Sequence, residues 1–241
     1  PALSYAPILV EEPWAYPLAT TALWLTIRAI DAPRWGAVLL ALGACVAAAA
    51  TRSQLLVLVV ALGLSLLALA WGSTRIVAWR ASWTRWDQLG AVVLTVGIVL
   101  GLSALLGHVS YEWQYTTGFW HGRILEYGLW AGGAFAVGLG VLPVVALLSV
   151  LFVRGEDRSR RGAHAFVVVT TSAVAGLGWY AGLKGAYLST KFSSLIVERN
   201  LVYLTPLAFA ATAYVLSRAR PPWWGIVGSG AFVGWMVTVT P

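Results

Sequence analysis

Two adjacent carboxylates stand directly before the first long apolar stretch of the chain. Glu11 and Glu12 are followed by Pro13 and then by apolar and aromatic residues. A charge at the edge of an apolar stretch is costly unless it is solvated, paired or bound to a cation. Carboxylate oxygens suit Mg²⁺ or Mn²⁺. The pair therefore indicates either a solvated interfacial pair or a group that binds a divalent cation or orients a hydroxyl.

A single arginine occupies a four-residue break between two apolar stretches. The break reads Thr51-Arg52-Ser53-Gln54. A planar guanidinium held near a membrane surface suits a phosphate, to which it can donate two parallel hydrogen bonds. The same arginine could instead extend toward lipid headgroups. Both interpretations of Arg52 remain open at this stage.

The segment 108–126 mixes aromatic and polar residues more densely than its surroundings. It contains His121 and Arg123 among Trp, Tyr and Glu residues. Aromatic faces next to hydrogen-bonding groups suit a sugar or an isoprenoid near a membrane interface. An interfacial amphipathic helix has much the same composition. We therefore name His121 and Arg123 as candidate substrate-binding residues against that alternative.

A fourth polar segment, 184–200, ends in Glu198-Arg199-Asn200 directly before an apolar stretch. Glu198 and Arg199 could cap the following helix and pair with other loops. Alternatively, Arg199 and the nearby Lys191 reach a substrate phosphate. These two interpretations are equally compatible with the residues.

The elements that must position these segments are membrane helices. Of the 241 residues, 59% are hydrophobic and 10% are charged, and the mean hydropathy is +0.79. Ordinary soluble domains carry about 25% charged residues. Apolar runs of the length that crosses about 30 Å of hydrocarbon predict an all-α, polytopic transmembrane bundle of about eight spans within one domain, residues 1–241. The predicted spans are 14–30, 36–51, 54–72, 88–107, 127–153, 164–183, 201–217 and 222–239.

The distribution of basic residues predicts the orientation of this bundle. Eleven of the 16 Lys and Arg residues fall on one side of the predicted spans and five on the other. The richer side is expected to be cytoplasmic. Its links, 31–35, 73–87, 154–163 and 218–221, are short and Arg-rich, which is typical of topology signals and headgroup anchors. All four polar segments described above then lie on the extracytoplasmic face.

Several classes of protein are disfavoured by what the sequence lacks. There is no P-loop, dinucleotide-binding glycine fingerprint, zinc-binding His-Glu-x-x-His or Gly-x-Ser-x-Gly. The single cysteine, Cys45, excludes an internal disulfide. The net charge of +7 is a matter of membrane orientation and does not indicate a nucleic-acid partner. Span centres carry almost no charge, which disfavours an ion-coupled transporter.

Three stretches resemble the multi-spanning C-fold (GT-C) glycosyltransferases that use polyprenyl-phosphate sugars, especially the actinobacterial members. They are Ser4 through Leu18, the 51–54 tetrapeptide, and Val197 through Leu207. The resemblance implies an integral protein of the bacterial cytoplasmic membrane with an extracytoplasmic active face. It implies a polyprenyl-phosphate sugar donor, membrane lipids as surroundings, and a glycan, lipid or protein acceptor.

The same resemblance implies roles for individual residues. Glu11 or Glu12 would bind a divalent cation, Mg²⁺ or Mn²⁺, or orient the acceptor, while Arg52 and Arg199 would lie near the donor phosphate. The family's catalytic base lies in a first external loop that has no counterpart here. We therefore expect a fragment whose base lies upstream of Pro1 and which is inactive alone. A lipid-linked glycan flippase or other transporter, or a non-enzymatic scaffold, are the alternatives.

Overall fold

The computed structural model confirms the predicted all-α class. It describes residues 12–72, 84–86, 89, 93, 123–153, 161–189, 198–217 and 223–241, and within these no strand occurs. The α-helices are α2 (Glu12–Asp31), α3 (Trp35–Thr51), α4 (Val57–Trp71), α7 (Ile124–Leu139), α8 (Val141–Ser149), α10 (Arg161–Leu188), α11 (Thr205–Leu216) and α12 (Trp223–Val239). The short 3-10 helices are η2 (Ser53–Leu56), η4 (Val150–Phe152), η5 (Glu198–Asn200) and η6 (Val202–Leu204).

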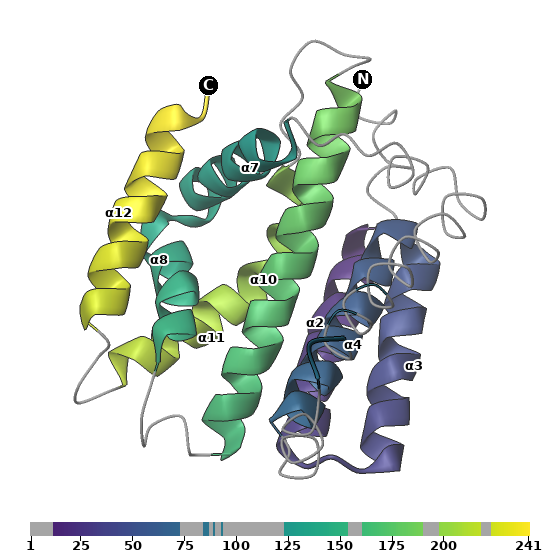
Figure 1. Ribbon diagram of the computed structural model, residues 1–241. Helices are drawn as coiled ribbons and strands as arrows, with labels where there is room; N and C mark the ends of the chain where they lie inside the picture. Colours follow the sequence, from purple (N-terminus) through teal and green to yellow (C-terminus); the bar gives the residue numbers. More distant parts are fainter. Residues whose placement is uncertain are drawn as a thin grey trace.

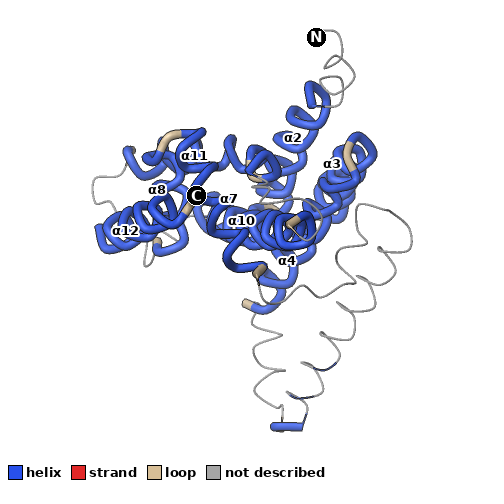
Figure 2. The backbone as a smooth tube through the Cα atoms, turned by 90° about the horizontal axis from the view of Figure 1, so that it is seen from above, coloured by secondary structure: helices blue, strands red, loops and turns tan. Residues whose placement is uncertain are grey.

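The long helix α10 runs through the middle of the molecule and separates two groups of helices. The helices α2, α3 and α4 lie on one side of it, and α7, α8, α11 and α12 lie on the other (Figures 1 and 2). It packs directly against α7, α4 and α2. The residues of α10 that face these neighbours are almost all apolar or small, and Val167, Val169, Ala173 and Ala181 are fully buried.

Two short connections on the α2–α4 side define the ends of the bundle. Residues 32–34 join α2 to α3 at the lower end in Figure 1, and Arg52 with η2 joins α3 to α4 at the upper end. Pro33 favours this break, because the residue before a proline is restricted away from helical backbone angles. At Arg52 the backbone is extended, with φ −147° and ψ 117°. The break predicted at 51–54 therefore forms a short connection between α3 and α4.

The predicted span 127–153 is not one continuous helix. Gly140 has φ 99° and ψ 139°, and it separates α7 from α8. A side chain at this position would strain the backbone, so glycine permits the change of direction. Pro143 then lies in the first turn of α8, where its missing N–H removes no helical hydrogen bond. The result is that α7 crosses α10 while α8 runs down beside α12 (Figure 1).

Glycines on both helices allow the close crossing of α7 and α10. A Cβ added at Gly182 would lie 2.5 Å from the carbonyl oxygen of Ile124 and 3.3 Å from the Cα of Gly128. Small residues at such crossings let helix backbones approach, which is a common device in membrane helices. α7 is thereby held against the upper half of α10.

Two helical segments in the described part of the chain are long and apolar enough to cross a membrane, Ser53–Trp71 and Gly162–Leu188. The other apolar helices of the described ranges have 10–17 residues. The eight-span arrangement therefore stays a prediction, and its span 88–107 lies outside the described residues except for Leu89 and Val93. Helix α10 also extends past the predicted end of its span at residue 183 and includes Lys184, whose ammonium lies 5.7 Å from the centre of the Tyr180 ring.

Candidate functional site

A buried hydrogen bond joins two of the predicted site segments at the upper end of the bundle. The side-chain amide of Gln54 donates to the hydroxyl of Tyr203 across 3.5 Å. Both residues are 3% exposed. The contact links the turn that carries Arg52 to the segment that carries Arg199, although 149 residues separate the two partners. Buried polar groups are normally paired, so this long hydrogen bond helps to fix the position of both segments.

The chain's first described helix contacts the same segment. α2, which begins at Glu12, packs against η6, the short helix that contains Tyr203. Residues 198–204 are therefore contacted both by α2 and by the 51–56 connection, two segments distant in sequence. The three segments contain or adjoin the three stretches that carry the family resemblance. The side chain of Glu12 lies outside what the structure describes, so its predicted role stays a prediction.

Arg199 lines a small cavity between η5, the start of α11 and α7. The cavity has a volume of about 240 Å³ and is bounded also by Phe135, Gly138, Val202 and Thr205. Within the described residues, the buried hydroxyl oxygen of Thr205 has no hydrogen-bond partner. Thr205 is the first residue of α11, but η6 runs directly into this helix, the Thr205 N–H donates to the carbonyl oxygen of Val202, and Pro206 has no N–H. Among the described lining residues, the guanidinium of Arg199 is therefore the group that suits a phosphate.

The neighbouring Asn200 adds a second unsatisfied polar group. It is 1% exposed, and neither atom of its side-chain amide has a hydrogen-bond partner in the described ranges. Such groups are rare in folded proteins because an unpaired buried amide is costly. A residue outside those ranges, a water molecule or a ligand must therefore satisfy Asn200.

A larger apolar cavity adjoins the Arg199 cavity at Phe135. It has a volume of about 370 Å³ and lies between α7, α8, α10, η6 and α12. Its walls are apolar side chains and glycines, including Gly128, Gly132 and Gly178. Phe135 belongs to the wall of both cavities. Trp179 is the one described lining residue with a hydrogen-bonding side chain, and so apolar a space suits a hydrocarbon chain better than a sugar or an ion.

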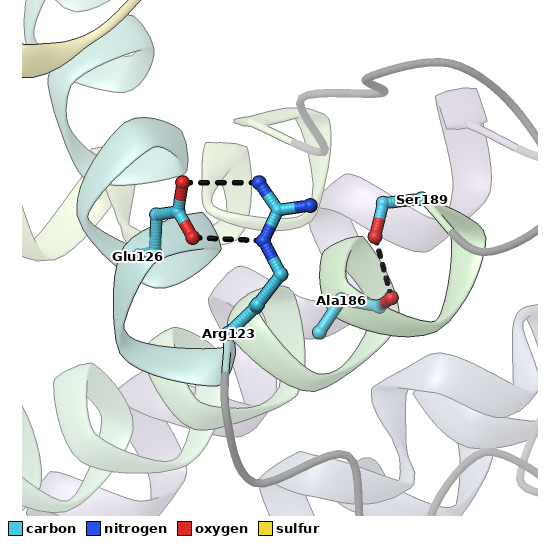
Figure 3. Close-up of polar contacts among 4 residues, drawn as sticks. All are labelled: Arg123, Glu126, Ala186 and Ser189. Atoms are coloured by element: carbon cyan, nitrogen blue, oxygen red, sulfur yellow. Dashed lines mark hydrogen bonds and ion pairs between the residues drawn. The ribbon is translucent and has the colours of Figure 1, made fainter.

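Arg123, another predicted site residue, forms an ion pair with Glu126 in the first turn of α7 (Figure 3). Its Nε and one terminal nitrogen donate to the two carboxylate oxygens of Glu126 at 2.9 and 3.1 Å. The guanidinium also lies 4.9 Å from the centre of the Tyr127 ring and 6.0 Å from that of Trp130. These contacts use the parallel donors that a phosphate would need. Arg123 therefore organises the start of α7 in this state of the protein.

The ion pair with Arg123 lowers the pKa of Glu126. The hydrogen bonds from Arg123 hold the pKa of the Glu126 carboxyl below its ordinary value. The stabilising contribution of the pair is therefore present above the ordinary glutamate pKa of about 4.3 and is lost as the pH falls through the lower folded value. We expect ¹³C-NMR titration of the Glu126 carboxyl to give a midpoint below about 4.3. In Arg123→Gln the midpoint should return toward that value, and equal midpoints in both proteins would contradict the pairing.

The remaining predicted site residues fall outside the described ranges. These are Glu11, His121 and Lys191. Within the described ranges, no three His, Cys, Asp or Glu side chains lie close enough together to hold a metal ion. Because Glu11 is outside them and the Glu12 side chain is not described, the expected cation site stays a prediction.

Sequence reasoning missed the residues that join the predicted segments. Gln54 was noticed only as part of a turn, and Tyr203 only as part of a resemblance. A signal for both existed: each is a polar side chain at the edge of an apolar stretch, where an unpaired polar group is costly. What the sequence alone lacked was any indication that the two were partners.

Comparison with known proteins adds no relative to this picture. No family model, curated protein or solved structure matches the chain. The functional proposal below therefore depends on the residues and cavities described above.

Proposed function

We propose that this chain is part of an integral-membrane glycosyltransferase that transfers a sugar from a polyprenyl-phosphate donor to an acceptor outside the cytoplasm. The observation that carries the proposal is a pair of neighbouring cavities that share Phe135 in their walls. Arg199 lines one cavity, and the other is lined almost entirely by apolar side chains and glycines. A lipid phosphate has the same two parts, a charged head and a hydrocarbon chain. A single ligand of this kind would satisfy both environments.

The arrangement of the bundle supports the same proposal. The Gln54–Tyr203 contact joins two segments that adjoin connections which the distribution of basic residues predicts to be extracytoplasmic. The described segments contain few charged residues away from the helix ends, as expected of several membrane spans. We propose the multi-pass topology and this orientation together with the activity.

The proposed reaction is a displacement at the anomeric carbon of the donor sugar. The acceptor hydroxyl oxygen forms the new bond to that carbon, and the bond from the carbon to the phosphate oxygen breaks. The lipid phosphate leaves with the electron pair, and its growing negative charge is stabilised by Arg199. Arg52 would assist from the adjacent connection. The hydroxyl proton passes to a carboxylate base.

The activity is tested by incubating the full-length protein in vesicles with a radiolabelled polyprenyl-phosphate sugar and a mixture of cell-envelope acceptors. We expect release of lipid phosphate together with label in the acceptor. A lipid-linked glycan transporter would move the donor across the bilayer without cleaving it. Movement without cleavage, or neither event, would contradict the glycosyltransferase proposal.

A further inference from the structure

A second polar cavity lies at the opposite, lower end of the bundle. It has a volume of about 390 Å³ and is lined by Ile30, Asp31, Pro33, Arg34, Leu69 and His164, together with Ala32. This volume falls within the range of small-molecule sites, about 300–1,000 Å³. The walls come from the end of α2, the α2–α3 link, the last turns of α4 and the first turn of α10. The cavity is therefore separate from the proposed phosphate site at the upper end.

Opposite charges line this cavity without pairing with one another. One carboxylate oxygen of Asp31 is buried and has no hydrogen-bond partner in the described part of the chain. The guanidinium of Arg34 is exposed, and no ion pair of its side chain occurs among those residues. A buried carboxylate oxygen is costly unless a donor satisfies it. The cavity therefore offers one site for a cationic donor and another for an anion.

The level of the cavity within the bundle indicates where such a ligand would come from. Leu69 lies in the last turn of the candidate membrane span Ser53–Trp71, and His164 lies in the first turn of the candidate span Gly162–Leu188. Trp35 and Trp71, which are 85% and 55% exposed, lie at the same end. Tryptophan is enriched where a helix leaves the hydrocarbon for the headgroup layer. In a membrane-inserted protein the cavity would therefore lie level with lipid headgroups.

We propose that this lower cavity binds the headgroup of a phospholipid that carries both a phosphodiester and a primary ammonium, as in phosphatidylethanolamine. The ammonium donates to the carboxylate of Asp31, a half-buried residue of the cavity wall, and the phosphodiester accepts from Arg34. Ile30, Pro33 and Leu69 contact the glycerol and the first carbons of the acyl chains. A glycerol headgroup offers Asp31 only neutral hydroxyl donors, which bind a carboxylate more weakly than an ammonium, and headgroups with a quaternary ammonium have no N–H to donate. The proposal depends on membrane insertion and is independent of the proposed glycosyltransferase activity.

The test is a lipid competition followed by native mass spectrometry. The full chain is purified in detergent and mixed with equal amounts of phosphatidylethanolamine, phosphatidylglycerol and phosphatidylcholine that share the same acyl chains. We expect the first bound lipid to be phosphatidylethanolamine at least fivefold more often than either competitor. Equal occupancy by the three lipids would overturn the proposal.

Variants assign this preference to the cavity. Asp31→Asn is expected to abolish the preference over phosphatidylglycerol, and Arg34→Gln is expected to lower the occupancy by all three lipids at least fivefold. Arg28→Gln is the matched control, because Arg28 is an exposed arginine near the same end that stacks on Trp24, 5.7 Å from its ring centre, and does not line the cavity. Only the mass peaks of folded protein are compared, so the lipid ratios do not depend on yield. Unchanged ratios in Asp31→Asn and Arg34→Gln would overturn the assignment.

A final arm separates a membrane lipid from a soluble ligand of the same chemistry. Glycerophosphoethanolamine has the same charged groups but no acyl chains. At a tenfold excess we expect it to leave the bound phosphatidylethanolamine in place, because it lacks the chains that contact Ile30 and Leu69. Displacement would overturn the assignment to a membrane lipid in favour of a soluble phosphodiester.

Discussion

Replacing Arg199 with alanine in the full-length protein is expected to reduce sugar transfer about 10²- to 10³-fold, which is the usual cost of removing one donor aimed at a developing negative charge. Arg199 is exposed and lines a cavity beside the start of α11, and no other guanidinium of the described ranges lines that cavity. Removing it leaves no charged donor among the described lining residues to stabilise the departing phosphate. The measurement is the initial rate of lipid-phosphate release at saturating donor.

Two further variants give this prediction its controls. Arg199→Lys retains the charge but loses the planar pair of donors, so we expect an intermediate rate. Arg28→Ala removes an exposed arginine at the opposite end of the bundle and should leave the rate unchanged. A wild-type rate in Arg199→Ala would contradict the role of Arg199 in binding the phosphate.

Arg52→Ala is expected to lower the rate of lipid-phosphate release as well, because Arg52 lies in the connection that the Gln54–Tyr203 hydrogen bond joins to the Arg199 segment.

The second large effect is expected in the stability of the bundle, at the crossing of α7 and α10. In Gly182→Ala the new methyl group would lie 2.5 Å from the carbonyl oxygen of Ile124, which is too close for a non-bonded carbon and oxygen. The backbones must separate, and overpacking of this kind costs about 1–3 kcal/mol. We expect the midpoint of thermal unfolding in detergent or nanodiscs to fall by several degrees.

Gly178→Ala is the matched control for this effect. Gly178 lies one turn earlier in the same helix and faces the apolar cavity, and a Cβ there has no atom within 4 Å. Both substitutions gain the same helix propensity, about 1 kcal/mol in favour of alanine. Gly178→Ala should therefore unfold at or slightly above the wild-type temperature. Equal unfolding temperatures for the two variants would show that the crossing is not tightly packed.

The helical elements could be predicted from sequence because their signals are local. Uniformly apolar runs predicted α3 and α4, and the polar tetrapeptide at 51–54 predicted the connection between them. The break at Gly140 was not predicted, since the same segment holds other glycines that continue the helix, and only φ 99° distinguishes Gly140. Glycine inside an apolar segment is ambiguous because it serves helix packing as often as it ends a helix.

Contacts between distant segments explain what the sequence could not predict about the sites. Gln54 and Tyr203 are 149 residues apart, and no local pattern pairs them. The lower cavity was overlooked for the same reason. The 31–35 link alone is typical of a topology signal, and its role changes only when α4 and α10 bring Leu69 and His164 beside it. In both cases the identity of the side chains was visible in the sequence, but their proximity was not.

The central claim is that Arg52 and Arg199 lie on one face of the membrane and Arg34 lies on the other. Single cysteines at these three positions, in a Cys45→Ala background that removes the buried native thiol, can be labelled in intact cells with a membrane-impermeant maleimide. The account predicts that cysteines at 52 and 199 react from outside, while a cysteine at 34 reacts only after permeabilisation. Reaction of positions 52 and 199 from opposite sides would contradict it.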